Sequence, residues 1–140
     1  MSSWIKELPP LVENKQTGWK PYPIFSGSTR CLDEFSSHMS ILSPEITPHE
    51  PHSHQEEELL IMLSGEADIV RPDKEIANIE TREIIRPGSF VYYPAFQPHT
   101  IHNVSKKPAT YLMFKWQTQE TSKKNYLKTK IFSYSKDPKS

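Results

Sequence analysis

The stretch His52-Ser53-His54-Gln55-Glu56-Glu57-Glu58 decides which fold and which chemistry we expect of this chain. On a β-strand, alternate side chains point to the same face of the sheet. If one strand runs through the stretch, His52, His54 and Glu58 project from one face. His99 follows 41 positions after Glu58 and can supply a fourth donor. Imidazoles with a carboxylate suit a divalent transition metal such as Fe, Mn, Ni, Cu or Zn.

The flanking residues extend these side chains into two longer patterns. They are His52-x-His54-x3-Glu58-x6-Gly65 and Gly88-x5-Pro94-x4-His99-x3-Asn103. In order and internal spacing the two patterns resemble the two motifs of the cupin family, and the resemblance covers roughly residues 35–116. The family usually has glycine at two turn positions where this chain has Ile46 and Phe96.

The resemblance implies an all-β fold, a cupin-type antiparallel β-barrel or jelly roll. It also implies that His52, His54, Glu58 and His99 bind one divalent transition metal inside the barrel. We favour Fe(II), with Mn, Ni, Zn or Cu as alternatives. The neighbouring carboxylates Glu56 and Glu57 compete with Glu58, and a β-bulge would change which of them faces inward. The spacing to Gly65 in the first motif favours Glu58.

Short apolar runs punctuated by proline and glycine predict the strands of this barrel. We expect strands at 35–42, 59–63, 67–70, 89–93 and 109–116, and one or two more marked by Ile76, Ile79, Ile84 and Ile85. Leu60 and Met62 keep the parity of the metal ligands and should form an apolar floor beneath them. We find no convincing helix in the core and no internal repeat.

Three segments make up the chain on this interpretation. Residues 1–30 form an extended arm rich in proline and aromatic residues, which either lies along the barrel as strand and loop or is exchanged with a second subunit. Residues 31–116 form the barrel. Residues 117–140 form a polar, basic tail or lead into a further element, such as a second barrel.

Four further residues near the motifs have proposed roles. His49 lies near the barrel mouth, where it could position a substrate or act as general base, and it competes with a plain surface position. His38 could line the interior opposite the metal. His49 and His38 are therefore our candidate catalytic residues. His102 has the opposite parity from His99 and should point outward. Asn103 should tie a turn by hydrogen bonds and not bind the metal.

Bulk properties limit the partners of the chain. Lys plus Arg and Asp plus Glu number 17 each, so the formally neutral chain gives no case for nucleic acid or a membrane surface. Cys31 is the only cysteine, which excludes an internal disulfide. We find neither a signal peptide nor an apolar run long enough to span a membrane, so we expect a cytoplasmic protein. The expected partners are a small molecule and a second copy in a homodimer.

The resemblance leaves the reaction open. A metal with open coordination positions can bind a substrate and polarise a carbonyl or enolate, or bind O2 if it is ferrous. The family's range includes dioxygenases, isomerases or epimerases, and decarboxylases or lyases. We favour an Fe(II)-dependent dioxygenase acting on a small polar molecule. An isomerase, epimerase or lyase acting on a sugar or keto acid and a non-catalytic small-molecule-binding protein are the alternatives.

Overall fold

The computed structural model describes residues 4–118, and in this part of the chain it contains strands and no helix. The strands in chain order are β1 Trp19–Gly27, β2 Glu34–Leu42, β3 Glu57–Ser64, β4 Ala67–Pro72, β5 Glu80–Ile85, β6 Phe90–Tyr93, β7 Thr100–His102 and β8 Ala109–Gln117. Accordingly, the described residues include no helix of the length and hydropathy needed to cross a membrane.

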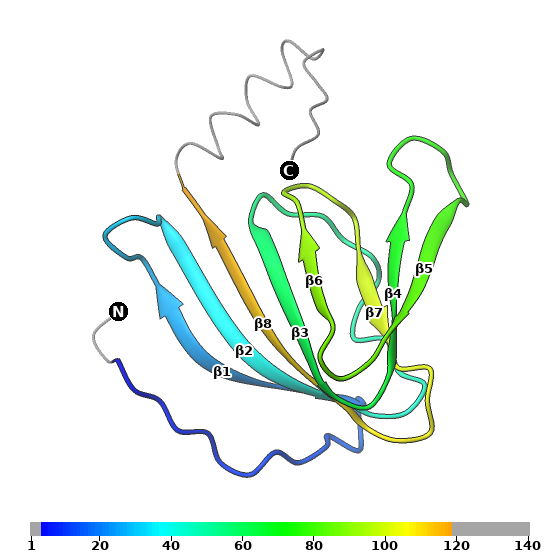
Figure 1. The fold of residues 1–140 in the computed structure, drawn as a ribbon, viewed down its shortest axis with the longest axis horizontal. Coiled ribbons are helices and arrows are strands. Elements are labelled where there is room, and N and C mark those ends of the chain that lie inside the picture. The colour runs from blue at the N-terminus through cyan, green and yellow to red at the C-terminus, as the bar shows by residue number, and fades with distance from the viewer. Residues whose placement is uncertain (1–3, 119–140) are drawn as a thin grey trace.

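The strands form two sheets that face each other, as Figure 1 shows. One sheet has the order β1-β2-β8-β3-β6 and the other has the order β5-β4-β7. Every strand pair is antiparallel. Most neighbours within a sheet are not consecutive in the chain, so the chain crosses repeatedly from one sheet to the other, as in a jelly roll. The predicted all-β antiparallel architecture is confirmed.

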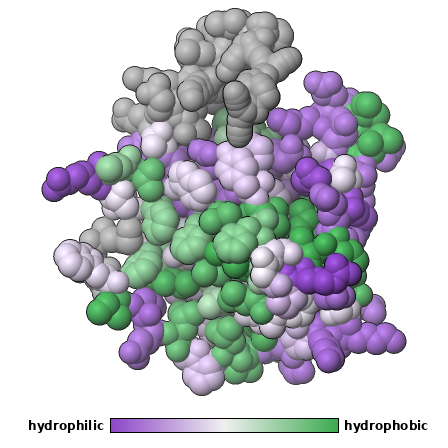
Figure 2. Space-filling view, in the orientation of Figure 1, coloured by the Kyte–Doolittle hydropathy of each residue, from purple (hydrophilic) through white to green (hydrophobic). Residues whose placement is uncertain are grey.

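The hydrophobic core lies between the two sheets and follows the period of two that a strand imposes. On β3, Leu60 and Met62 are 0% exposed, whereas Leu63 is 43% exposed. They pack in one cluster with Ile69 and Ile101 of the other sheet. In Figure 2 apolar side chains gather over the middle of the face in view, with polar side chains around them. Full burial of one such side chain stabilises the fold by about 1.5–3 kcal/mol, and the prediction that Leu60 and Met62 face inward is confirmed.

The strands at 35–42, 59–63, 67–70 and 109–116 were placed to within two residues at each end, but the prediction for Ile76 and Ile79 is wrong. Both side chains are exposed in the connection between β4 and β5. The carboxylate of Asp73 accepts hydrogen bonds from the backbone N–H groups of Glu75 and Ile76 at 2.8 and 2.9 Å. This local turn ends the strand before the isoleucines are reached.

Part of the predicted N-terminal arm belongs to the larger sheet. β1 pairs with β2 along its length, and the Tyr22 hydroxyl accepts a hydrogen bond from the Val12 N–H at 2.8 Å. Residues 19–27 therefore form an edge strand of the larger sheet in this chain, and exchange of the arm with a second subunit stays a prediction. Of the predicted tail 117–140, Gln117 ends β8, and residues 119–140 lie outside the described part of the chain.

Asn103 anchors the turn that follows β7. Its side chain is fully buried, and its Nδ2 donates to the carbonyls of Leu42 and Lys107 at 2.9 and 2.8 Å. Its Oδ1 accepts from the Ser105 N–H at 2.9 Å, and its own N–H donates to the Ile46 carbonyl at 3.0 Å. Asn103 therefore ties a turn, as predicted, and it also fixes the start of the loop that leads to His52.

Two glycines with positive φ give a matched test of the turn geometry. A Cβ on Gly65 (φ +79°) would lie 2.6 Å from the Pro108 carbonyl oxygen and 2.8 Å from Ala109 Cα, whereas a Cβ on Gly88 (φ +95°) meets nothing within 4 Å. We expect Gly88→Ala to lower the free energy of unfolding by about 1 kcal/mol through backbone strain alone. Gly65→Ala should cost roughly 3 kcal/mol or more, because backbone must also move. Urea unfolding measures both values, and equal losses would contradict the proposed clash.

Candidate metal centre

The two segments that carry the histidines are joined directly by their backbones. The N–H of His52 donates to the His99 carbonyl at 3.2 Å, and the N–H of His99 donates to the His52 carbonyl at 3.0 Å. This pair is an isolated antiparallel bridge outside the strands. A third bond, from the Phe96 N–H to the His54 carbonyl at 2.7 Å, holds the same two segments together. Residues far apart in the sequence are thereby held at a fixed separation.

The assumption that His52 and His54 lie on one regular strand with Glu58 is wrong. β3 begins at Glu57, and residues 53–56 are irregular. The parity argument holds from Glu58 onward but does not apply to the two histidines. Their positions follow instead from the bridge to His99 and the bond to Phe96.

Phe96 stands at a turn where glycine is usual in the family pattern. Its φ is 67°, in the left-handed region that is unfavourable for a bulky side chain. Such a conformation costs on the order of 1–3 kcal/mol and persists only where the surroundings hold it. The bond from its N–H to His54 is one such restraint.

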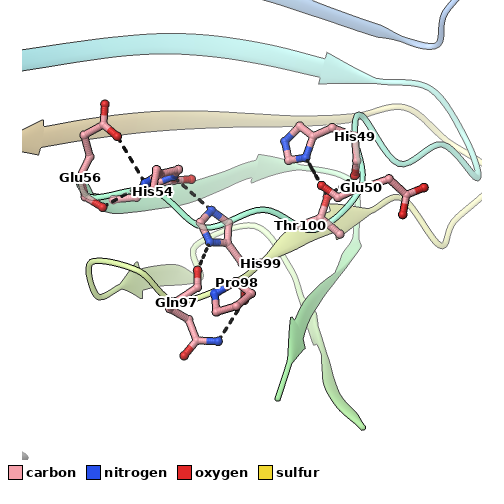
Figure 3. A network of polar contacts seen from close by, with 9 residues as sticks. His49, Glu50, His54, Glu56, Gln97, Pro98, His99 and Thr100 are labelled. Atoms are coloured by element: carbon pink, nitrogen blue, oxygen red, sulfur yellow. Dashed lines mark hydrogen bonds and ion pairs between the residues drawn. The ribbon is translucent and has the colours of Figure 1, made fainter. Parts of the chain in front are cut away.

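The imidazoles of His52, His54 and His99 form a nearly equilateral triangle. Their ring centroids are 5.2 Å apart for His52–His54, 5.3 Å for His52–His99 and 5.2 Å for His54–His99. One ring nitrogen from each residue lies within 4.8 Å of the other two. This is a cluster that could hold a metal ion. Figure 3 shows His54 and His99 turned toward each other, each backed by a polar contact.

Backbone carbonyls orient two of these rings. His54 Nδ1 lies 3.1 Å from the Glu56 carbonyl and His99 Nδ1 lies 2.7 Å from the Gln97 carbonyl. A carbonyl can only accept, so each Nδ1 carries the proton, and in the neutral ring Nε2 has a lone pair. This is the outer contact that metal-binding histidines usually make. Both lone pairs therefore point inward.

Both Nε2 atoms point at the same carboxylate oxygen. Glu58 Oε1 lies 3.0 Å from His54 Nε2 and 3.2 Å from His99 Nε2. Two lone pairs facing an anionic oxygen repel unless a cation lies among them, either a proton or a metal ion. Glu58 is 1% exposed, and its Oε2 is buried without a hydrogen-bond partner among residues 4–118. Burying a carboxylate without enough hydrogen bonds or positive charge around it costs free energy. A divalent metal bound by these donors would supply that charge.

The electrostatics agree with an ionised Glu58. Burial alone would raise its pKa, but the hydrogen bonds and charges of His54 and His99 outweigh burial and lower the pKa to about 2. The pKa of His54 is raised chiefly by its bond to Glu58. The pKa of His52 falls to about 4, first through desolvation and then through the neighbouring histidines. His52 is thus a neutral imidazole near pH 7, the form that binds metals.

The rival carboxylates point elsewhere. Glu57 accepts a hydrogen bond from the Tyr92 hydroxyl on the outer side of the sheet. Glu56 makes an ion pair with His54 Nδ1 at 3.5 Å, on the side of the ring away from Glu58. Glu58 is the carboxylate that the structure brings to the histidine cluster.

Two further rings stack on histidines of the cluster. His49 stacks on His52 with ring centroids 4.1 Å apart, and Tyr93 stacks on His99 at 3.8 Å, both with 16° between the planes. Stacking of aromatic rings contributes on the order of 1 kcal/mol per pair. These contacts limit rotation of the His52 and His99 rings.

The cluster opens on a cavity of about 130 Å³ between the sheets. The cavity is lined by Trp19, His38, His49, His52, Glu58, Leu60, Tyr93, His99, Thr100, Ile101, Tyr111, Met113 and Lys115. A space this small suits a compact molecule, since drug-sized ligands occupy roughly 300 Å³ or more. Both candidate catalytic residues, His38 and His49, line it. His102 instead bonds to Thr47 Oγ1 at 2.7 Å and does not line this cavity, as predicted.

Comparison with known proteins identifies the family. Residues 39–115 match the family described as Cupin domain (Cupin_2), which is more than half of the 140 residues. The chain therefore belongs to the cupin family. No curated protein matches it.

Three solved structures illustrate the shared fold. A protein from Thermus thermophilus has a TM-score of 0.59 at 19% identity, covering 74% of this chain and 87% of that chain. A cupin-superfamily sugar phosphate isomerase from Silicibacter pomeroyi has a TM-score of 0.51 at 23% identity, covering 60% and 51%. Oxalate oxidase in complex with the substrate analogue glycolate has a TM-score of 0.55 at 19% identity, covering 74% and 53%. The chain spans about half the length of the last two, and likeness at these identities shows the fold alone.

His54→Ala should abolish tight metal binding while the barrel stays folded. We expect the affinity to fall by more than about 100-fold, because loss of even an outer contact costs 10–100-fold. His102→Ala is the matched control, since it removes an imidazole that bonds to Thr47 outside the cluster. Metal content by elemental analysis and stability by urea unfolding check both variants. Unfolding of His54→Ala, or equal metal content in the two, would contradict the assignment.

Glu58→Gln and Glu57→Gln distinguish the neighbouring carboxylates. Each change keeps the side-chain shape and removes one charge. Glu58→Gln should weaken metal binding at least about tenfold, because a buried anionic donor is lost, and Glu57→Gln should leave it unchanged. Competition with a chromogenic chelator gives both affinities. A larger loss of metal affinity in Glu57→Gln than in Glu58→Gln would contradict the assignment of Glu58 as the carboxylate ligand.

Proposed function

We propose that this chain is a small metal-dependent cupin enzyme that acts on a small polar organic molecule. The convergence of three imidazoles and a buried carboxylate beside a partly open cavity is the observation that supports this most. A ligand in the cavity would contact His52, His99 and Glu58, which line it. A purely structural barrel gains nothing from a buried Glu58 whose Oε2 has no hydrogen-bond partner in the described part of the chain.

The roles of the residues follow from the contacts described above. His52, His54, Glu58 and His99 would hold one divalent metal, and the carbonyls of Glu56 and Gln97 would keep two of the rings in the binding tautomer. When bound, the metal supplies Lewis acidity and, if it is ferrous, a site for O2. Fe(II) is the metal we favour, followed by Mn, Ni, Zn or Cu.

Two imidazoles outside the cluster could move protons. His38 lines the cavity from β2, and burial followed by the charge of Lys115 lowers its pKa, so it is a neutral imidazole. His49 lines the cavity beside His52. We propose that one or both take or deliver a proton at the substrate.

Our first reaction to test is dioxygenation with Fe(II). An isomerase, epimerase or lyase is the second, favoured by the two cavity-lining imidazoles, since these reactions need a base and an acid near one carbon. The fold's neighbours include an oxidase and a sugar phosphate isomerase, so the same barrel carries both kinds of chemistry. A non-catalytic protein that binds a small molecule is the third. The homodimer and the cytoplasmic location stay predictions.

Anaerobic loading with Fe(II), followed by O2 uptake with catechols, thiols and keto acids, tests the proposal. We expect about one metal per chain and substrate-dependent O2 consumption that His54→Ala lacks. A loaded protein that consumes no O2 with any of them favours the isomerase or lyase alternative. Stoichiometric ligand binding without turnover identifies a binding protein. Metal content below about a tenth of an equivalent after reconstitution would sink the metalloenzyme proposal itself.

A further inference from the structure

Lys115 lines the cavity beside the histidine cluster. On β8 the alternate residues Tyr111, Met113 and Lys115 line the cavity. A lysine at such a position is unusual, because an ammonium group loses hydration unless a partner replaces the water. The two residues before it in the row are apolar or aromatic, so packing does not require a cation here.

The lysine has no partner of opposite charge among residues 4–118. In the register of the sheet, Lys115 lies directly opposite Glu58. The Glu58 carboxylate nevertheless turns to His54 and His99, and no carboxylate of the described residues lies within ion-pairing distance of the Lys115 ammonium. The positive charge is therefore available to a molecule in the cavity.

His38 supplies a second donor on the adjacent strand. Its Nδ1 lies 3.0 Å from Ser40 Oγ, and Ser40 Oγ accepts a hydrogen bond from Trp19 Nε1 at 3.1 Å. One arrangement that satisfies all three groups has the Ser40 hydroxyl donating to Nδ1, with the His38 proton on Nε2. His38 is then a neutral ring with a fixed N–H donor. In the register of β2 and β8, His38 lies opposite Met113, and Lys115 is two positions further along on the same face, so both side chains line one part of the cavity.

We propose that Lys115 and His38 form an anion subsite. It would bind the carboxylate of a small organic acid that lies against the histidine cluster. This proposal deepens the proposed function. It rests on that function only for the part of the acid that would contact the metal, and not for the carboxylate at Lys115 and His38. Charge supports an anion, because a divalent metal, one carboxylate and one lysine leave a net positive charge in the cavity. Size supports a small acid, because about 130 Å³ holds only on the order of ten water molecules.

Calorimetric titration with glycolate and with its neutral isostere glycolamide tests the subsite. Zinc-loaded and metal-free protein are both titrated, for the wild type, Lys115→Met, Lys115→Arg and the control Lys106→Met. Lys106 is exposed and does not line the cavity, so its replacement makes the same change of charge elsewhere. Metal content and urea unfolding are measured on every variant.

We expect Lys115→Met to weaken glycolate binding about tenfold or more, as for a lost charged hydrogen bond. Lys115→Arg should restore most of the affinity, Lys106→Met should stay within about twofold of the wild type, and glycolamide should bind weakly to all. Metal content should not change with Lys115. Equal glycolate affinity in wild type and Lys115→Met, no preference over glycolamide, or no glycolate binding by either form of the wild type would overturn the subsite. Lys115-dependent glycolate binding in a protein that takes up no metal would support the subsite and defeat the metalloenzyme.

Discussion

The reciprocal pair of backbone hydrogen bonds between His52 and His99 is the constraint on which the rest of the site depends. His52 lies in an irregular connection, whereas His99 directly precedes β7, so the bridge ties this loop to the smaller sheet. Backbone hydrogen bonds do not depend on side-chain rotamers. The bridge therefore fixes the positions of the backbone atoms from which the imidazoles of His52 and His99 project. The carbonyls of Glu56 and Gln97 and the stacking of Tyr93 then fix where they point. A site prepared in this way would lose little conformational entropy on binding a metal ion.

The sheet adds what the loops cannot supply. Because side chains alternate strictly along a strand, the inward row of β3 places Glu58 above Leu60 and Met62. The antiparallel register with β8 brings Lys115 opposite Glu58, and the register with β6 brings Tyr93 there from the other side. One row of the larger sheet thus holds an anion, a cation and an aromatic ring at the edge of an apolar floor. Charges in such surroundings interact more strongly than in water.

The spacing of the two motifs was enough to predict the fold and the cluster. It named His52, His54, Glu58 and His99. The structure brings the three histidines together and places Glu58 against two of them, His54 and His99. The reasoning for the first two was nevertheless incomplete, because a regular strand was assumed where a bridge and an irregular turn do the positioning. Spacing in a sequence records which residues meet but not which backbone brings them together.

Other parts of the site lay outside the reach of sequence patterns. The strand at 109–116 was predicted, and its alternation could have shown that Lys115 shares a face with Tyr111 and Met113. Lysine is so often exposed that the inward direction was not considered. Trp19 lies in the predicted arm, and only the pairing of β1 with β2 brings it to the cavity. The stacking of His49 on His52 depends on loop geometry that no period describes.

Anomalous diffraction from crystals of the metal-loaded protein tests the central claim most directly. The account predicts a single strong peak per chain, within bonding distance of imidazole nitrogens from His52, His54 and His99 and of an oxygen of Glu58. A peak at any other place, or strong metal binding in solution with these four side chains uncoordinated, would contradict it.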